Sequence, residues 1–298
     1  MFESRPLIGI MLMASATCFF SLHDLTAKSL SQTFPVPMLV WARYSVHFLV
    51  MLVMLAPSMR LKLIITKRPL EHISRGLMLV ITSCFGIAGF RHLPLAEATA
   101  VVFISPFIVL LLARWLLHEK ITVSRWLAVI FGLFGVLLIA RPGGVVSSQG
   151  LIFLVLAACT YAIYSIQTRQ LSPSENSLTM LFYTALVGAV SMTLAIPFYW
   201  DSPIPNTVQI LQIISMGVLS GIGQLLFIRA FRHASASTLS PFAYTQLIWA
   251  ILLGWLFYDH LPDGLSIAGI AAITASSMSI ALSERFKRRS APDTDTAC

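Results

Sequence analysis

Long apolar runs separated by short polar breaks make up most of the chain. Several stretches contain no Asp, Glu, Lys or Arg at all, among them residues 6–23, 126–140, 142–168, 176–200 and 202–228. About 20 apolar residues are enough for a helix to cross the hydrocarbon core of a bilayer. The runs are continuously apolar and do not alternate with polar residues, as the strands of a membrane barrel would. The pattern therefore predicts an all-α, polytopic membrane protein.

Ten membrane-spanning helices fit these runs and the breaks between them. The predicted spans cover residues 7–29, 36–56, 73–91, 96–117, 123–140, 149–170, 176–198, 208–230, 235–258 and 264–283. The breaks carry turn-forming residues, as in Pro142-Gly143-Gly144. Nearly all loops are short, so neighbouring helices are expected to run antiparallel. Residues 284–298 are predicted to form a polar cytoplasmic tail.

A segment in the first half of the chain returns near the other end. Phe90-Arg91-His92 recurs as Phe231-Arg232-His233, and each copy precedes an apolar run that ends in an acid. Further pairs keep their order at nearly one offset: Gly9 with Gly150, Cys18 with Cys159, Phe20 with Tyr161, Lys28 with Arg169, and Gly76 with Gly217. Ordered matches of this kind predict two copies of one unit. We place the two units at residues 7–140 and 149–283.

Composition and charge support the membrane class. Hydrophobic residues make up 57% of the chain and charged residues 11%, whereas a soluble domain carries about a quarter charged residues. The net charge is +8, but the basic residues lie between apolar runs, where they set membrane orientation, and no nucleic-acid partner is expected. The four cysteines show no metal-ligand spacing, and we expect no metal or other cofactor.

The basic residues also predict the orientation of the chain. If the N-terminus is inside, most of them lie on the inner side, including Arg75. The outer side then holds only Lys28, Arg91 and Arg141, and Arg43 lies within the second span. This bias places both termini in the cytoplasm. A unit of five helices is odd, so the second unit must enter the membrane in the opposite sense, as in the inverted repeats of secondary transporters.

Specific residues in each half carry a resemblance to a known family. In the first half they are Ala96, Ser105, Pro106, Glu119, Arg125, Trp126, Gly132, Gly135 and Arg141-Pro142-Gly143; in the second they are Ala236, Ser240, Pro241, Asp259 and Gly269. The pattern resembles the EamA domain of the drug/metabolite transporter superfamily over nearly the whole chain. Two departures are Asp259, where the family usually carries glutamate, and Gln246, opposite Pro106. The resemblance implies ten spans, cytoplasmic termini and transport of small metabolites without ATP.

Charged residues within the predicted spans are the first candidates for function. Asp24 and Lys28 lie one turn apart near the outer end of the first span. A charge within a bilayer is costly and is expected to face the bundle interior or a water-filled cavity. Asp24 is therefore a candidate for substrate binding or proton coupling. Alternatively, Asp24 and Lys28 pair with each other at i,i+4, with Lys28 reaching towards the interface.

Arg43 and His47 share one face of the second span. Arg43 could bind a carboxylate or phosphate of the substrate. Alternatively, it forms a structural pair with Asp24 that holds two helices together. In either case we expect Asp24 and Arg43 to lie within salt-bridge or water-bridged distance, or to face one polar cavity.

Aromatic and amide side chains form a second group of candidates. Tyr161 and Tyr164 share a face of the sixth span and could recognise a ring or a polar group, or could form part of an interfacial aromatic belt. Gln224, Tyr244, Gln246 and Trp249 belong to the same class of candidate lining residues. Glu119 and Asp259, which close equivalent helices, could be gating or coupling acids, or interfacial residues that orient a loop, and we favour the second interpretation.

Small residues four apart, such as Gly217 and Gly221, favour close helix packing, and we expect these contacts within one chain. No enzymatic motif is found: His118-Glu119 lacks a second histidine four residues on, and no phosphate-binding Gly-Lys-Ser/Thr loop occurs. The sequence therefore predicts a secondary transporter of the cytoplasmic (inner) membrane and not an enzyme.

The predicted partners are a small-molecule substrate, the lipid bilayer and protons, with the chain acting as a monomer or homodimer. The predicted function is transport by alternating access of a small metabolite, such as an amino acid or a related compound. The alternatives are uptake of a larger nutrient or nucleoside-like cofactor, and a membrane-embedded enzyme or partner subunit.

Overall fold

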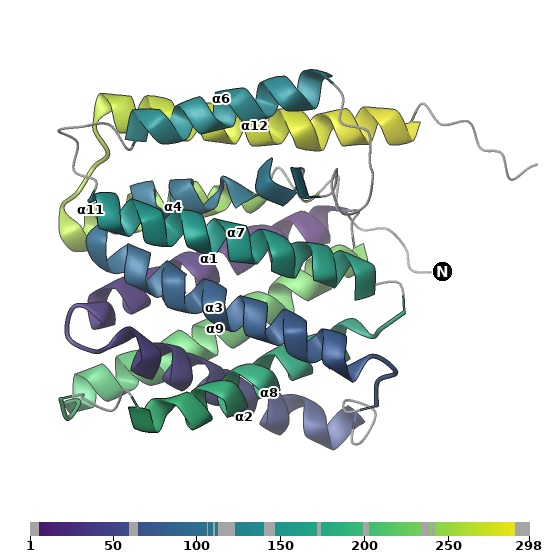
Figure 1. Ribbon diagram of the computed structural model, residues 1–298, viewed down its shortest axis with the longest axis vertical. Coiled ribbons are helices and arrows are strands. Elements are labelled where there is room, and N and C mark those ends of the chain that lie inside the picture. Colours follow the sequence, from purple (N-terminus) through teal and green to yellow (C-terminus); the bar gives the residue numbers. More distant parts are fainter. Residues whose placement is uncertain are drawn as a thin grey trace, which may run out of the picture.

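The computed structural model describes most of the chain. The described residues are 6–59, 65–105, 107–109, 111–112, 123–139, 147–171, 174–198, 203–233, 239 and 242–289. Within these ranges every regular element is helical (Figure 1). In chain order the helices are α1 (Pro6–Ser31), α2 (Val36–Met59), α3 (Pro69–His92), α4 (Leu95–Val102), α6 (Val123–Ile139), α7 (Ser148–Leu171), α8 (Ser177–Ala195), the short 3-10 helix η2 (Ile196–Phe198), α9 (Thr207–His233), α11 (Thr245–Tyr258) and α12 (Gly264–Arg289).

Six of the described helices are long and apolar enough to cross a membrane. The candidate spans are Leu7–Ser31, Val36–Val53, Pro69–His92, Ser148–Thr168, Leu178–Phe198 and Thr207–Phe227. Four shorter apolar stretches accompany them: Leu95–Val109, Ile130–Ile139, Thr245–Tyr258 and Gly264–Ser276. The prediction of an all-α chain with many apolar helices is confirmed.

Two predicted boundaries differ from the structure. Helix α12 continues to Arg289, so the predicted tail at 284–298 begins inside a helix. The predicted span 96–117 is interrupted, because α4 ends at Val102 and Phe103 and Ile104 form a turn. Pro106 follows in the sequence, and a proline cannot donate a hydrogen bond to the carbonyl of the residue four positions earlier.

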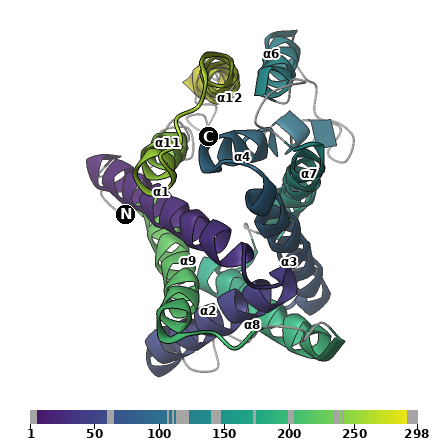
Figure 2. The same cartoon turned by 90° about the vertical axis from the view of Figure 1, so that its left-hand side faces the viewer.

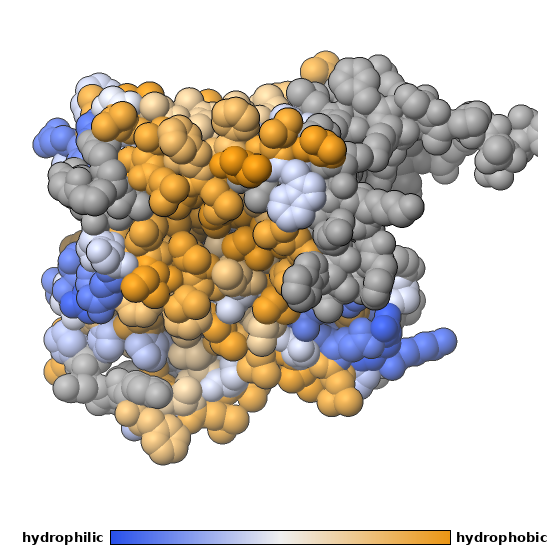
Figure 3. Space-filling view, turned by 45° about the horizontal axis from the view of Figure 1, so that its top comes forward, coloured by the Kyte–Doolittle hydropathy of each residue, from blue (hydrophilic) through white to orange (hydrophobic). Residues whose placement is uncertain are grey.

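Apolar side chains cover a broad band of the molecular surface. Figure 3 shows this band between polar residues that gather at two opposite edges of the view. Large side chains on α6 lie in the open, including Phe134 at 54% and Leu137 at 67% exposure, and Trp255 on α11 is 52% exposed. Such a surface would aggregate in water but fits the hydrocarbon of a bilayer, as expected of a multi-pass membrane protein.

The helices of the two predicted units pack against each other in a symmetric pattern. Helix α1 packs along α9, and α3 packs along α7 (Figure 2). Helix α2 packs on α8, α4 on α11, and α6 on α12. Each contact joins one helix of the first unit to one of the second. Helix α7 is the equivalent of α1 in the second unit, and α9 is the equivalent of α3. Exchanging the two units therefore converts the α1–α9 contact into the α7–α3 contact, which is the pattern that a two-fold axis produces.

Equivalent glycines make equivalent contacts at these helix crossings. A Cβ at Gly76 on α3 would lie 2.8 Å from the Cβ of Val187 on α8, and a Cβ at Gly217 on α9 would lie 2.4 Å from that of Val46 on α2. Gly76 and Gly217 are a predicted repeat pair, and Val46 and Val187 are separated by the same offset. The expectation that Gly217 serves a contact within one chain is confirmed.

Candidate functional site

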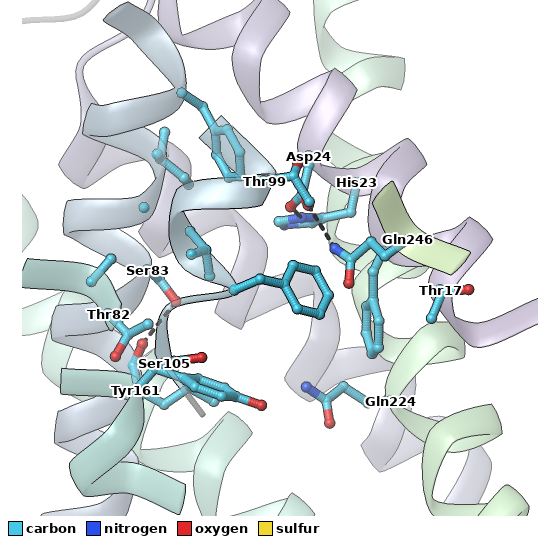
Figure 4. A pocket seen from close by; sticks show the side chains of 18 of the residues that line it. Thr17, His23, Asp24, Thr82, Ser83, Thr99, Ser105, Tyr161, Gln224 and Gln246 are labelled. Atoms are coloured by element: carbon cyan, nitrogen blue, oxygen red, sulfur yellow. Dashed lines mark hydrogen bonds and ion pairs between the residues drawn. The ribbon is translucent and has the colours of Figure 1, made fainter. Parts of the chain in front are cut away.

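A cavity of about 270 Å³ lies between the two units. Its walls come from α1, α2, α3 and α4 of the first unit and from α7, α9 and the start of α11 in the second. The polar side chains that line it are Thr17, His23, Asp24, Arg43, Thr82, Ser83, Thr99, Ser105, Tyr161, Gln224 and Gln246. All of them except Arg43 are labelled in Figure 4. Phe20, Phe90, Phe103 and Phe227 supply aromatic surface. The cavity therefore offers both charge and flat apolar rings to a solute.

The cavity brings together residues that were predicted from distant parts of the sequence. Asp24, Arg43, Tyr161, Gln224 and Gln246 all line it. They lie on five different helices. Each of these helices turns a polar side chain towards the space between the units. The other predicted candidates lie elsewhere.

Asp24 is bonded to two neighbouring side chains at the cavity wall. Its Oδ1 lies 3.0 Å from Nδ1 of His23, and the Gln246 amide donates to Oδ2 at 3.1 Å (Figure 4). The Ser21 hydroxyl, one turn earlier, donates to the Gln246 carbonyl at 3.2 Å. These bonds join α1 of the first unit to α11 of the second. Asp24 thus links the two units as well as presenting a carboxylate to the cavity.

Arg43 has neutral partners. Its Nε donates to Ser220 at 3.2 Å and its Nη1 donates to Ser83 at 3.0 Å. The guanidinium also lies 5.4 Å from the centre of the Tyr44 ring. Within the described ranges no ion pair joins Arg43 to an acid, so the predicted structural pair with Asp24 is absent. The other arrangement that we predicted, with both residues facing one cavity, is present.

Lys28 does not pair with Asp24 either. Its ammonium donates to the carbonyls of Phe90 and Leu93 at the end of α3, and lies 5.6 Å from the centre of the Tyr258 ring. The alternative of an i,i+4 ion pair on α1 is therefore wrong. Lys28 instead ties α1 to α3, one turn beyond the cavity.

Four predicted lining residues do not line the cavity. His47 is 3% exposed and packs against Gly221 of α9, where the absence of a side chain lets the two helices approach. Tyr164 accepts a hydrogen bond from Arg75. Tyr244 is buried and its ring lies 5.1 Å from that of Phe103. Trp249 lies further along α11 than Gln246 and is outside the lining.

Arg75 is a buried residue that the sequence analysis counted as an inner-side charge. It is 2% exposed, and it donates to the Tyr164 hydroxyl at 3.2 Å, to Thr184 at 2.6 Å and to the Met180 carbonyl. It therefore fastens α3 to α7 and α8. Its position inside a predicted span was the signal that could have identified it, because a charge there needs partners.

Glu97 was not identified from the sequence. Its side chain is 2% exposed, and Oε1 lies 3.2 Å from Nε2 of His260. The signal was an acid at the start of an apolar run. Of the two acids that were considered, Glu119 lies outside the described residues. Asp259 caps α11 in the left-handed conformation, with φ at 49°, which supports the interpretation that it orients a loop.

Comparisons with known proteins agree with this architecture. The EamA-like transporter family model matches residues 7–141 and again residues 148–282. The S-adenosylmethionine uptake transporter of Rickettsia bellii is 28% identical over 223 residues, which cover 74% of this chain and 75% of that protein. The pseudopaline exporter CntI of Pseudomonas aeruginosa is 28% identical, over 93% of this chain and 97% of its own. The riboflavin transporter of Rhizobium johnstonii is 27% identical, over 96% of this chain and 95% of its own.

A solved crystal structure matches with a TM-score of 0.67 and 18% identity, covering 96% of this chain and all of its own. It shows the same fold. The two family matches together span almost the whole sequence, so the chain belongs to the EamA-like transporter family. It is a multi-pass membrane transporter for a small molecule.

Proposed function

We propose that the chain is a secondary active transporter that moves a small amphoteric metabolite by alternating access. The solute would carry an anionic group, a cationic or hydrogen-bonding group, and an apolar or ring portion. It would bind in the cavity between the units, where inverted-repeat transporters place their substrates.

The observation that carries this proposal is the state of Arg43. Its guanidinium lines the cavity with only serine hydroxyls as hydrogen-bond partners among the described residues. A positive charge at membrane depth is costly without a counter-charge. A solute carboxylate would supply that charge and could use the planar donor geometry of arginine. The Gln224 side chain in the same cavity offers an amide oxygen that would accept a hydrogen bond from the cationic or hydrogen-bonding group of the solute.

An amino acid or a related compound satisfies this description best. The aromatic lining also suits the alternative of a nucleoside-like cofactor, because flat rings stack on flat rings. S-adenosylmethionine, which names one relative, carries both an amino-acid group and an adenine ring. The relatives include both an uptake transporter and an exporter, and we propose export for an amino-acid-like solute and uptake for a cofactor-like one.

We further propose ten spans in two inverted units, with both termini in the cytoplasm and the chain in the inner membrane. The symmetric helix pairing supports an exchange of the two units. The odd number of helices in each unit supports inversion. The glycine crossings lie within one chain, so a monomer is sufficient to form the cavity.

Two measurements on purified protein test this function. The first is the shift in melting temperature on adding S-adenosylmethionine, riboflavin or individual zwitterionic amino acids, since a ligand that binds the folded state raises its stability. The second is the flux of the stabilising solute into proteoliposomes. We expect an amphoteric solute to stabilise the protein and to cross the membrane, and Arg43→Gln to weaken its binding by about tenfold or more, as removal of a charged hydrogen bond does.

A matched control is Arg68→Gln, which removes an equally charged side chain at an exposed end of α3, 41% accessible and paired with Glu71. It should leave binding unchanged. Equal binding by the wild type and Arg43→Gln would contradict the proposed role of Arg43. Stabilisation without flux in the wild type would contradict transport and favour a partner subunit.

A further inference from the structure

The lining of the cavity ends one turn before Lys28 on α1. Its lining follows α1 from Met13 through Thr17 to Asp24 and goes no further. The next turn carries Lys28, whose ammonium is bonded to the carbonyls of Phe90 and Leu93. In the proposed orientation this is the outer end. Contacts that hold α1, α3 and their neighbours together here are therefore the candidates for controlling access to the cavity from outside.

One contact at this end joins the two units directly. Glu97 lies in the first turn of α4, in the first unit, and His260 follows α11, in the second. Their side chains meet at 3.2 Å between Oε1 and Nε2, across 163 residues of sequence. His260 is 28% exposed on its side chain and Glu97 only 2%. The contact therefore lies between the surface and the cavity wall, to which α4 contributes Thr99 and Val102.

The second carboxylate oxygen of Glu97 is buried and has no hydrogen-bond partner within the part of the chain that the structure describes. A buried hydrogen-bond acceptor without a donor lowers stability. Most buried polar atoms in proteins therefore have a hydrogen-bond partner. The Lys28 ammonium is bonded to the carbonyl of Leu93, which precedes Glu97 by only four residues, and the opposite charges of Lys28 and Glu97 attract each other. An ammonium has three donors, and two of those on Lys28 are used by the α3 carbonyls.

We propose that Glu97 and His260 form the outer gate of the transport pathway. The contact breaks when the cavity opens to the outside, and the freed carboxylate is then held by Lys28. This exchange keeps a buried charge paired in both states, which an opening motion at membrane depth requires. The inference rests on the proposed alternating access, and it assigns the residues that close the outer end of the cavity.

The test measures access to the cavity and needs no solute. Gly86 lines the cavity, and a Cβ there would meet no atom of the described residues within 4 Å, so Gly86→Cys is expected to place a thiol in the cavity. The reporter is made in a chain whose own cysteines (Cys18, Cys84, Cys159 and Cys298) are replaced by alanine. Its rate of reaction with a membrane-impermeant maleimide is measured in right-side-out and in inside-out vesicles.

Glu97→Leu and His260→Ala each remove one half of the gate. We expect each to raise the labelling rate from outside by roughly tenfold, the effect of losing a hydrogen bond to a charged group. Because both remove the same contact, the double variant should not exceed the larger single effect. His260→Ala changes a partly exposed residue, so it tests the gate even where Glu97→Leu does not fold. Folding of every variant is checked by gel filtration.

Glu71→Leu is the matched control. Glu71 lies on the first turn of α3, at the end of that helix opposite to the carbonyls that Lys28 binds, and its side chain is 41% exposed. It should not change labelling from outside. Unchanged outside labelling in both gate variants would overturn the proposal, as would an equal rise in Glu71→Leu or a rise from the inside alone. Labelling is independent of flux, so failure of the gate and failure of the proposed transport are distinguishable.

Discussion

Asp24 illustrates how a single residue serves both packing and function. Its carboxylate is bonded to His23 and Gln246, and it faces the same cavity as Arg43. Imidazole and carboxylate side chains are common proton donors and acceptors in proteins. The His23–Asp24 pair thus faces the cavity in which the solute is proposed to bind.

Replacing Asp24 by asparagine keeps the shape of the side chain and removes its ability to change charge. We expect Asp24→Asn to abolish proton-driven accumulation of substrate and to leave equilibrating exchange largely intact. Both activities are measured in proteoliposomes, with and without an imposed proton gradient. Unchanged proton-driven uptake would exclude Asp24 from coupling, and loss of both activities would make it a binding or structural residue.

At the scale of helices, α6 packs on α12 through direct contact between their backbones. A Cβ at Gly135 would lie 2.7 Å from the carbonyl oxygen of Gly269, and a Cβ at Gly269 would lie 2.6 Å from that of Gly135. Backbone atoms cannot move aside as a flexible side chain can. The two helices therefore need glycine at both positions to keep their present separation.

This contact predicts a clear difference between glycine substitutions. Gly135→Ala and Gly269→Ala should each lower the free energy of unfolding by about 1 to 3 kcal/mol, because the added methyl overpacks the crossing. Gly86→Ala is the control, since no atom of the residues that the structure describes lies within 4 Å of the added Cβ. It should leave stability unchanged or raise it by up to about 1 kcal/mol through helix propensity. Unfolding in mixed detergent micelles measures all three, and equal effects would contradict the packing argument.

At the scale of the whole molecule, the two ends can be distinguished by their contacts. The end of α3 meets the start of α7, where a Cβ at Gly150 would touch Leu93. At the other end, the Thr66 hydroxyl donates to Glu175 at 2.9 Å, just after α7. Helices α7 and α12 both begin at the left-hand end of Figure 1. Ser148 and Asp263 thus lie at one end and Thr66 at the other.

The proposed orientation predicts how these ends react. Cysteines at Ser148 and Asp263, in the cysteine-free chain, should react with an impermeant maleimide from outside, and a cysteine at Thr66 only from inside. Labelling of intact and inverted vesicles checks this. The reverse pattern would show that the termini are outside and that the Glu97–His260 contact closes the inner end.

The sequence determined the class of protein, the helical content and the repeat. These depend on local properties, since an apolar run of sufficient length forms a helix in a membrane whatever its neighbours are. The same reasoning placed Asp24 and Arg43 near a cavity, because a charged side chain within a membrane span is too costly to expose to lipid. It also anticipated the contact of Gly217 with a helix of the same chain.

Only the tertiary structure decided which polar residues share the cavity and which are used for packing. His47 and Tyr164 resemble Arg43 and Tyr161 in the sequence, yet one packs against Gly221 and the other binds Arg75. The contact between Glu97 and His260 spans both units. Such choices depend on how distant helices cross, and crossing is set by the combined packing of both surfaces, which no single stretch of sequence contains.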